Sequence, residues 1–371
     1  MLFIRRGDDM KFLLSINTIK AGSGGAQRVV ALIADELSNQ GHDVMLILYE
    51  PTSNSDYFVN EKVQKIVLER STGKKIKYYI SKFTALRSAI RKFDPDVIIP
   101  FLADQTLYIY LATRGTKYRN RIITTVRNNP RVFPKSRKLR IQNNILIALS
   151  KANFVQNNEQ KNYFPKFIQN KTFVLPNPVN EELLHCQRKA REIKNIVTLG
   201  RLSEQKNQEM LIDAFSIVSN KHPNIKLKIY GKGEKQKQLE AYIEKMSLTE
   251  RVELAGVTND VKDVLLKSDL FVMTSNYEGM PNALIEAMAT GLPCISTDCP
   301  TGPSDLISNR LNGLLIKMNS VDECAAAMEY MISNQLDAWE MGEKAQLFIK
   351  EHYRCENIVN DLVGFSKEYL Y

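Results

Sequence analysis

The chain has 371 residues, a formal net charge of +10 and 44% apolar residues, so it is long enough for two domains with substantial cores. Its five cysteines include no CxxC pair and cannot all pair with one another, which fits a reduced, cytosolic protein better than a disulfide framework. No apolar run reaches the ~20 residues of a membrane span. Residues 1–9 are expected to be an extension without a role in the fold.

The positive charge is concentrated in the first half of the chain. Residues 1–190 carry 31 Lys and Arg against 15 Asp and Glu, whereas the remaining residues carry 20 against 26. No acidic residue occurs from Gln105 to Asn158. Such an asymmetry is expected of a two-domain protein in which only one domain meets an anionic partner.

Both halves alternate short apolar runs with amphipathic helical stretches. Runs of this kind are typical of strands buried on both faces of a parallel sheet, and they are predicted at 11–16, 43–48, 96–101, 121–126, 145–149, 195–200, 225–231, 251–256, 269–275, 293–297 and 313–316. Three helical segments follow from about Val321. The Pro-rich and polar stretch at 175–195 predicts the boundary between two doubly wound α/β domains, whose ligands are expected at the carboxyl ends of the strands.

A glycine-rich segment, NTIKAGSGGAQR (17–28), follows the first strand. It lacks the third glycine of a dinucleotide-binding motif, because Gln27 stands at that position, so NAD binding is not favoured. Gly24 and Gly25 still allow a ligand to approach the backbone at a helix N-terminus, where an anion is stabilised. A tight strand-to-helix turn without a ligand is the alternative.

Asp94-Pro-Asp96 has the form of a metal-binding DxD motif, but it precedes a predicted strand and therefore lies at the wrong edge of the sheet. A turn that ends a helix is the preferred interpretation, and no metal is predicted.

Two cations follow the first strand of the second half in GRLSEQKN (200–207). Arg201 comes directly after the strand, and Lys206 lies near the start of the next helix. Two fixed cations at this position predict a diphosphate-binding site, with solvated surface charges as the alternative.

Two glutamates bracket the segment EGMPNALIE (278–286) after the strand at 269–275. Glu278 is expected on a loop, and Glu286 about one turn into a helix that begins near Asn282. Carboxylates accept hydrogen bonds from the hydroxyl groups of a hexose or a ribose. Hydrolysis of a glycosidic bond would instead need the pair to face each other across a cleft, and a role as helix N-terminal charges is a further alternative.

These segments together are similar to those of a known enzyme family. GRLSEQKN, then Glu278 and Glu286 in an E-x7-E arrangement, then GLPCISTD, resembles the donor domain of the family 4 retaining glycosyltransferases of GT-B fold. GGAQR (24–28) resembles the GGAER-type loop of that family. TVRNNP (125–130) resembles the SERNDP-type segment of bacterial members that build surface polysaccharides and lipid-linked oligosaccharides. The resemblance covers about residues 10–365.

The resemblance implies two Rossmann-like domains that face a cleft. An acceptor-binding domain is expected at 10–180, a nucleotide-sugar-binding domain at 190–350, and a C-terminal helix at 351–371 that packs back toward the first domain. No metal or other cofactor is implied, because the nucleotide sugar, most simply a UDP-sugar, is a substrate.

The resemblance also implies roles for individual residues. Arg201 and Lys206 would bind the donor diphosphate, Glu286 the ribose, and Glu278 the hydroxyls of the donor sugar. Further donor contacts are implied for Gly24, Gly25, Gly279, Met280, Asn282, Ala283, Tyr230 and Val257. Arg127, which stands where the family often has a His, and Asn128 would face the acceptor, and Arg127 joins Glu278, Arg201 and Lys206 as a catalytic group.

The implied reaction is transfer of a hexose-type sugar with retention of configuration to a saccharide acceptor that is linked to a polyprenyl diphosphate. A nucleotide-sugar epimerase or phosphorylase, or a non-enzymatic module that binds an anionic surface, are the alternatives. The stretch at 71–92 carries seven basic and no acidic residues with apolar residues at helical spacing. With 117–121 and 131–140 it predicts peripheral binding to an anionic membrane on its inner face, whereas no nucleic-acid recognition motif is found.

Overall fold

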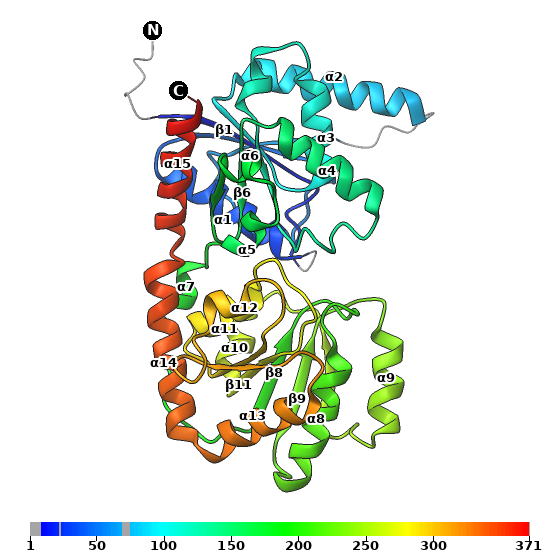
Figure 1. Cartoon of the computed structure of the whole chain (residues 1–371), viewed down its shortest axis with the longest axis vertical. Coiled ribbons are helices and arrows are strands. Elements are labelled where there is room, and N and C mark those ends of the chain that lie inside the picture. Colours follow the sequence, from blue (N-terminus) through cyan, green and yellow to red (C-terminus); the bar gives the residue numbers. More distant parts are fainter. Residues whose placement is uncertain (1–8, 22–23, 69–74, 371) are drawn as a thin grey trace. The chain divides into compact units, whose positions relative to one another are not determined.

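The computed structural model describes residues 9–21, 24–68 and 75–370 and shows two compact units (Figure 1). Unit 1 takes in the chain up to Pro178 and again from Cys355, and unit 2 is Val179–Arg354. Residues 1–8, most of the predicted extension, lie outside the described residues, as do Gly22 and Ser23 of the glycine-rich segment and residues 69–74. Among the described residues, no helix combines the length and the apolar character needed to cross a bilayer.

Unit 1 contains two parallel sheets that are joined by a bridge between Ile98 and Ile122. The first sheet has the order β3-β2-β1-β4 and the second the order β5-β6-β7. These strands are β1 (Lys11–Ile16), β2 (Asp43–Leu48), β3 (Gln64–Val67), β4 (Val97–Pro100), β5 (Ile123–Thr125), β6 (Ala152–Val155) and β7 (Thr172–Val174). Its helices are α1 (Gly25–Asn39), α2 (Lys75–Phe93), α3 (Ala103–Ala112), the 3-10 helix η1 (Lys117–Arg121), α4 (Arg137–Leu149), α5 (Asn158–Asn162), α6 (Lys166–Gln169) and α15 (Cys355–Leu370).

The C-terminal helix α15 completes the core of unit 1. Ile358, Val359 and Leu362 of α15 are buried in one apolar cluster with α1 and strands β1, β2 and β4. A second cluster on the other face of the sheet buries apolar side chains of α2, α3 and α4. The last helix of the chain is therefore structural for the first unit.

The strand predicted at 145–149 is wrong, because these residues form the end of helix α4. Leu146 and Ile147 are buried while Ile145 and Leu149 are exposed, which is a helical pattern of burial. A short apolar run cannot by itself distinguish a strand from a buried helix segment. The strand that belongs at this place is β6, which begins at Ala152 after the helix.

Unit 2 has one six-stranded parallel sheet with the order β10-β9-β8-β11-β12-β13. The strands are β8 (Asn195–Leu199), β9 (Lys226–Tyr230), β10 (Val252–Gly256), β11 (Leu270–Met273), β12 (Cys294–Thr297) and β13 (Leu314–Ile316). The helices are α7 (Glu181–Leu184), α8 (Gln208–Lys221), α9 (Gln236–Lys245), α10 (Val261–Lys267), α11 (Asn282–Ala289), α12 (Pro303–Leu306), α13 (Val321–Ser333) and α14 (Gln335–His352).

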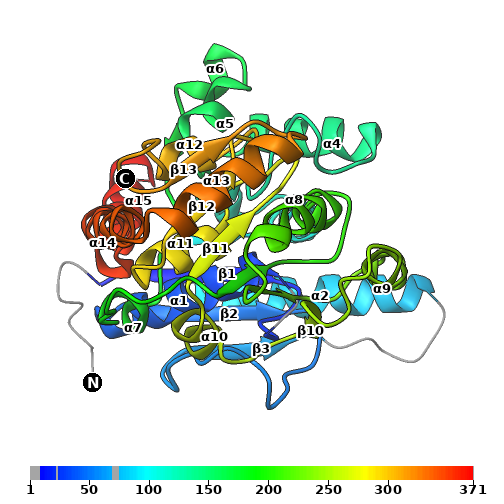
Figure 2. The same cartoon turned by 90° about the horizontal axis from the view of Figure 1, so that it is seen from below.

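Helices cover both faces of the unit 2 sheet (Figures 1 and 2). One core cluster packs the sheet against α8, α9 and α13, and the other packs it against α10, α11 and α14. Because the strand order reverses between β8 and β11, the connections from these two neighbours leave to opposite sides of the sheet. A crevice for a ligand is expected at that switch point, beyond the carboxyl ends of β8 and β11.

Candidate functional site

The switch point of unit 2 carries both predicted cations and the first predicted carboxylate. Arg201 and Lys206 lie on the loop after β8, and Glu278 lies on the loop after β11. Lys206 Nζ lies 2.5 Å from Glu278 Oε1, and both side chains are largely buried. The structure therefore brings together two groups that are 72 residues apart in the chain, as partners of each other.

Arg201 differs from Lys206 in its surroundings. Its side chain is exposed, and its guanidinium has no hydrogen-bond or ion-pair partner among the residues that the structure describes. Its backbone is fixed, because the carbonyl oxygen of Arg201 accepts a hydrogen bond of 2.9 Å from Gln208 Nε2. The loop is thus held while the guanidinium points to solvent.

Side chains that the sequence did not single out hold the two loops together. Gln205 Nε2 donates to the carbonyl oxygen of Tyr277 at 2.9 Å and to Glu278 Oε2 at 3.5 Å. Thr274 Oγ1 donates to the carbonyl oxygens of Lys206 and Asn207. Residues of this kind carry no motif of their own, and only their position beside the predicted residues could have marked them.

The Glu278 loop is anchored to the loop after β12. Glu278 donates its backbone N–H to the carbonyl oxygen of Pro300 at 2.9 Å, and Thr301 Oγ1 donates to the carbonyl oxygens of Glu278 and Gly279. At Gly302 (φ 100°) a Cβ would lie 2.8 Å from Pro281 Cδ and 3.0 Å from the carbonyl oxygen of Gly279. The close approach of these two loops therefore requires a glycine.

Helix α11 begins at Asn282, directly after this loop, and its second turn carries Glu286. The first turn of α11 contains no acidic residue, and its N-cap, Pro281, makes no side-chain hydrogen bond. This end of the helix is the positive end of the helix dipole. Glu278 and Glu286 are both buried. The backbone of Gly279, Met280, Asn282 and Ala283 lies between the two carboxylates along the chain.

Two glycines fix the loop after β9 against the loop after β8. A Cβ at Gly231 (φ 148°) would lie 1.8 Å from the carbonyl oxygen of Gly200, and a Cβ at Gly233 would lie 2.0 Å from that of Leu202. Tyr230, at the end of β9, and Val257, just after β10, lie at the same carboxyl edge of the sheet. The predicted base-binding residues and the predicted diphosphate-binding residues therefore share one rigid edge.

In unit 1, the described part of the glycine-rich segment includes Gly24 and Gly25. Gly24 has φ 150°, where a Cβ would lie 2.9 Å from Gln27 Oε1, and Gly25 begins helix α1. Arg127 and Asn128 follow β5 at the carboxyl edge of their sheet. Asn128 Oδ1 accepts a hydrogen bond from the backbone N–H of Asn129 at 2.7 Å, so this side chain is occupied in shaping its own loop.

The two aspartates of the DxD-like sequence have structural partners at the amino edge. Asp94 pairs with Lys117 at 2.8 Å, and this lysine holds the pKa of Asp94 below its usual value. Asp96 is buried, and its Oδ2 accepts a hydrogen bond from the backbone N–H of Lys11 at 2.9 Å. Among the described residues, no three His, Cys, Asp or Glu side chains gather in a way that could hold a metal ion.

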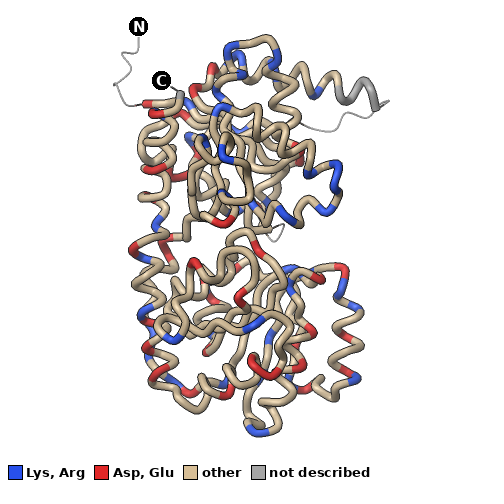
Figure 3. Tube along the Cα trace, viewed as in Figure 1, with Lys and Arg blue, Asp and Glu red and all other residues tan. Residues whose placement is uncertain are grey.

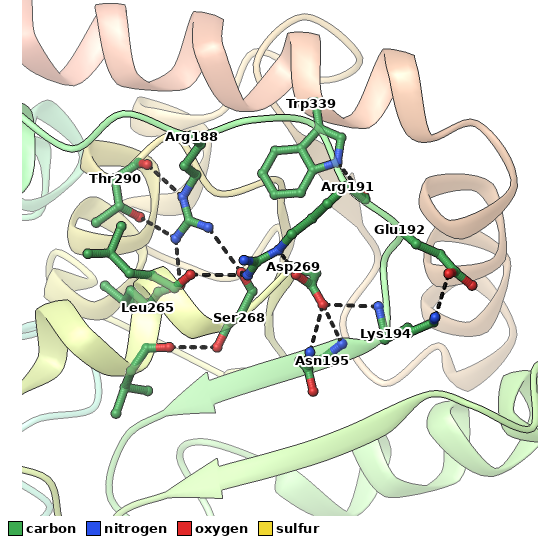
Figure 4. A network of polar contacts seen from close by, with 12 residues as sticks. Arg188, Arg191, Glu192, Lys194, Asn195, Leu265, Ser268, Asp269, Thr290 and Trp339 are labelled. Carbon is green, nitrogen blue, oxygen red and sulfur yellow. Dashed lines mark hydrogen bonds and ion pairs between the residues drawn. The ribbon is translucent and has the colours of Figure 1, made fainter.

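A polar network lies at the opposite, amino edge of the unit 2 sheet (Figure 4). Arg188 donates to the carbonyl oxygens of Thr290, Ser268 and Leu265, which lie at the ends of α11 and α10. Asp269 is paired with Arg191 and also accepts hydrogen bonds from the backbone N–H groups of Lys194 and Asn195. The network fixes the segment that leads into β8. It also provides a hydrogen-bond donor at the carboxyl end of α11, the helix whose amino end lies at the site.

Comparisons with known proteins match both units to glycosyltransferases. A family model described as Glycosyl transferases group 1 matches residues 181–348, and one described as Glycosyltransferase Family 4 matches residues 23–183. The chain is a glycosyltransferase that combines these two family domains. Its two Rossmann-like domains have the GT-B fold, as predicted from the sequence.

Individual relatives cover nearly the whole chain. An uncharacterized glycosyltransferase of Haemophilus influenzae is 27% identical over 95% of this chain and 98% of its own length. The GalNAc-α-(1→4)-GalNAc-α-(1→3)-diNAcBac-PP-undecaprenol α-1,4-N-acetyl-D-galactosaminyltransferase of Campylobacter jejuni is 26% identical over 88% of this chain and 90% of its own. The crystal structure of Staphylococcus aureus TarM with fondaparinux, α-GlcNAc-glycerol and UDP matches in fold, with a TM-score of 0.81, 16% identity and coverage of 96% and 99%.

Proposed function

We propose that this glycosyltransferase transfers a hexose-type sugar, with retention of configuration, from a UDP-sugar to a saccharide linked to a polyprenyl diphosphate. The observation that supports this most directly is the gathering of Arg201, Lys206 and Glu278 at the switch point of unit 2, beside the helix that carries Glu286. The lipid-linked acceptor is suggested by the Campylobacter jejuni relative, and UDP by the ligand of TarM.

In the proposed donor complex, Lys206 and Arg201 bind the diphosphate. The ammonium group of Lys206 has three donors, so it can keep Glu278 as a partner and still donate to a phosphate oxygen. The exposed guanidinium of Arg201 supplies a second charge as the phosphate becomes the leaving group. The N-terminus of α11 adds backbone N–H groups aimed at the same anion.

The carboxylates orient the sugars of the donor. Glu286 accepts hydrogen bonds from the ribose hydroxyls, and Glu278 accepts them from the hydroxyls of the transferred sugar. Tyr230 and Val257 line the base-binding end of the edge. In this mechanism the protein contributes positioning and charge stabilisation, and the departing phosphate takes the acceptor's proton.

The test is a transfer assay with a UDP-sugar and a lipid-linked saccharide, with the anomeric configuration of the product read by NMR. Glu286→Ala and Lys206→Ala are expected to abolish transfer while circular dichroism shows folded protein. Unchanged turnover in both variants would refute the site. Isomerisation of the donor without an acceptor would support an epimerase instead, and an inverted product would refute retention.

We further propose that unit 1 rests on an anionic membrane surface through helix α4. Ile141, Ile145 and Leu149 recur at every fourth position of α4 and are 52%, 54% and 59% exposed. The loop before α4 exposes Val132 and Phe133, and basic residues run along this loop and the start of the helix (Figure 3). An exposed apolar ridge with basic flanks is typical of a helix that lies in the headgroup region.

Helix α2 contributes less to this surface than the sequence predicts. Leu86 and Ile90 are buried in the core of unit 1, and Lys82 is buried against the rings of Tyr49 and Tyr108. Ile80 and Phe83 are the large apolar side chains of this helix that reach the surface among those described. The membrane face is therefore proposed on α4, with α2 as a packed helix that adds basic residues.

A further inference from the structure

The carboxyl edge of the second sheet of unit 1 carries three polar side chains from three neighbouring strands. Arg127 follows β5, Gln156 follows β6 and Asn177 follows β7. The three strands are parallel and hydrogen-bonded in the order β5-β6-β7, so their carboxyl ends meet at one edge. Neither Gln156 nor Asn177 belongs to a sequence motif.

Hydrogen bonds join these side chains and set the orientation of the arginine. Arg127 Nη1 and Gln156 Nε2 both donate to Asn177 Oδ1, at 3.0 and 2.9 Å. Gln156 is fixed in turn by Gln160, whose Nε2 donates to Gln156 Oε1 at 3.2 Å. The guanidinium also stacks on the ring of Phe101, with 4.7 Å between Cζ and the ring centroid.

The other edge of the guanidinium is left without partners. Arg127 Nε and Nη2 are both buried, and neither has a hydrogen-bond partner among the described residues. Burial lowers the pKa of Arg127 to about 9, so the side chain keeps its charge at neutral pH. Desolvation alone causes this shift, and no carboxylate of the described chain offsets it.

An arrangement of this kind is costly unless a ligand completes it. A buried donor without an acceptor loses its hydrogen bonds to water without a replacement, and the loss is larger when the donor is charged. The Nε–H and one N–H of Nη2 point in parallel, which is the geometry that binds two oxygens of one oxyanion. The hydrogen bond from Nη1 to Asn177 and the stacking of the guanidinium on the ring of Phe101 keep this edge in place.

We propose that Arg127 binds an oxyanion of a diphosphate through Nε and Nη2, and that Asn177 and Gln156 are positioning residues that hold the guanidinium for it. The inference rests on the proposed function, because both substrates of that reaction carry a diphosphate, the donor in its nucleotide and the acceptor in its lipid link. The ligand at Arg127 is therefore a phosphate oxygen rather than a sugar hydroxyl.

The test measures binding of UDP, of farnesyl diphosphate and of inorganic pyrophosphate to the full chain by calorimetry. Arg127→Gln is expected to weaken binding of at least one of the three by about tenfold or more, the loss of one charge-assisted hydrogen bond. Arg127→Lys is expected to recover only part of this affinity, because an ammonium group lacks the parallel pair of donors. Arg114→Gln, which removes an exposed arginine of unit 1 from the loop after α3, is the matched control and is expected to change affinity less than twofold.

The three probes distinguish the source of the oxyanion. A loss with UDP alone places the donor diphosphate at Arg127, and a loss with farnesyl diphosphate alone places the acceptor there. Equal affinity of Arg127→Gln and the unaltered protein for all three probes would overturn the inference. Failure of the proposed function is a separate result, since it is seen as undiminished transfer in Lys206→Ala and Glu286→Ala.

The Asn177→Asp variant distinguishes a ligand-binding role of Arg127 from a purely structural one. The new carboxylate gives Arg127 a counter-ion, so the melting temperature is expected to rise in either case. Only an oxyanion site also predicts that the affinity for the diphosphate probe falls, by about tenfold, because the charge is already neutralised. A stabilised variant with unchanged affinity for every probe would contradict the inference.

Discussion

Two half-buried arginines, one in each unit, show what the two edges of a parallel sheet are used for. Arg188 lies at the amino edge of unit 2, where carbonyl oxygens of Thr290, Ser268 and Leu265 accept its hydrogen bonds. Arg127 lies at a carboxyl edge of unit 1, where Nε and Nη2 have no partner among the described residues. Burial lowers the pKa of both, to about 10 for Arg188 and about 9 for Arg127, so each is a cation at neutral pH.

The difference separates a structural group from one that is held for a ligand. Every donor nitrogen of Arg188 has a carbonyl oxygen of the protein as its partner. Arg127 is also partly buried, but two of its three donor nitrogens have no hydrogen-bond partner among the described residues.

The largest expected effect is on stability. Arg188→Met removes three charge-assisted hydrogen bonds and is expected to lower the free energy of unfolding of unit 2 by about 3 kcal/mol. The carbonyl oxygens of Ser268 and Leu265 keep a second donor each, whereas that of Thr290 has no other donor among the described residues. Urea unfolding followed by the fluorescence of Trp339, the single tryptophan of the chain, reports on this unit. Arg127→Met, followed by circular dichroism, is expected to cost less than ~1 kcal/mol because it removes an unpaired buried charge. Equal losses of unfolding free energy in the two variants would show that Arg127 is as structural as Arg188.

The second prediction concerns the rigid carboxyl edge of unit 2. Gly233→Ala places a methyl group against the carbonyl oxygen of Leu202 and must displace the loop that carries Arg201 and Lys206. Affinity for UDP is expected to fall by about tenfold, a free-energy change of ~1.4 kcal/mol. Gly364→Ala is the control, since a Cβ there meets nothing within 4 Å. UDP affinity that is equal in both variants would show that the loop does not form the donor site.

The third prediction tests whether the proposed membrane face on α4 acts independently of the sites at the sheet edges. Ile145→Glu is expected to reduce flotation with vesicles rich in phosphatidylglycerol about fivefold. The substitution replaces an apolar side chain that would be buried among the lipids with a negative charge that the anionic headgroups repel. UDP affinity should not change, because Ile145 lies on α4 of unit 1. Ile217→Glu, at an exposed isoleucine of α8 in unit 2, is the matched control. Equal flotation of the two variants would refute the assignment to α4.

The smallest expected effect is on pH dependence. Arg127 loses its proton as pH rises through its lowered pKa of about 9, and an oxyanion binds only to the protonated form. Affinity for the diphosphate probe is therefore expected to be constant from pH 7 to 8 and to fall above pH 9. The ratio between the unaltered protein and Arg127→Gln is the quantity to follow, because other groups titrate in both. A constant ratio up to pH 10 would contradict a charge-dependent role.

The sequence predicted unit 2 more completely than unit 1, and the reason is physical. All six strands of unit 2 are apolar runs bounded by turns, and each was predicted in place. In unit 1, β3 is a partly exposed edge strand without an apolar run, and β6 and β7 have four and three residues. Strands this short and this polar give little periodicity to detect, whereas the apolar end of α4 imitates a strand.

The site shows the same limit. Arg201, Lys206, Glu278 and Glu286 were predicted because they follow strands in a recognisable spacing, although the ion pair between Lys206 and Glu278 was not. Gln156 and Asn177 are single polar residues after short strands, and nothing in the sequence joins them to Arg127. Their hydrogen bonds depend on the lateral order of β5, β6 and β7, which only the folded sheet supplies.

The ion pair between Lys206 and Glu278 has a consequence for turnover. Under the proposed function, Lys206 stays paired with Glu278 when UDP departs, so its ammonium group keeps a counter-ion in the empty site. This counter-ion stabilises the free enzyme and thereby lowers the free-energy cost of product release. Glu278 would then govern how quickly the catalytic cycle restarts as well as how the sugar is held.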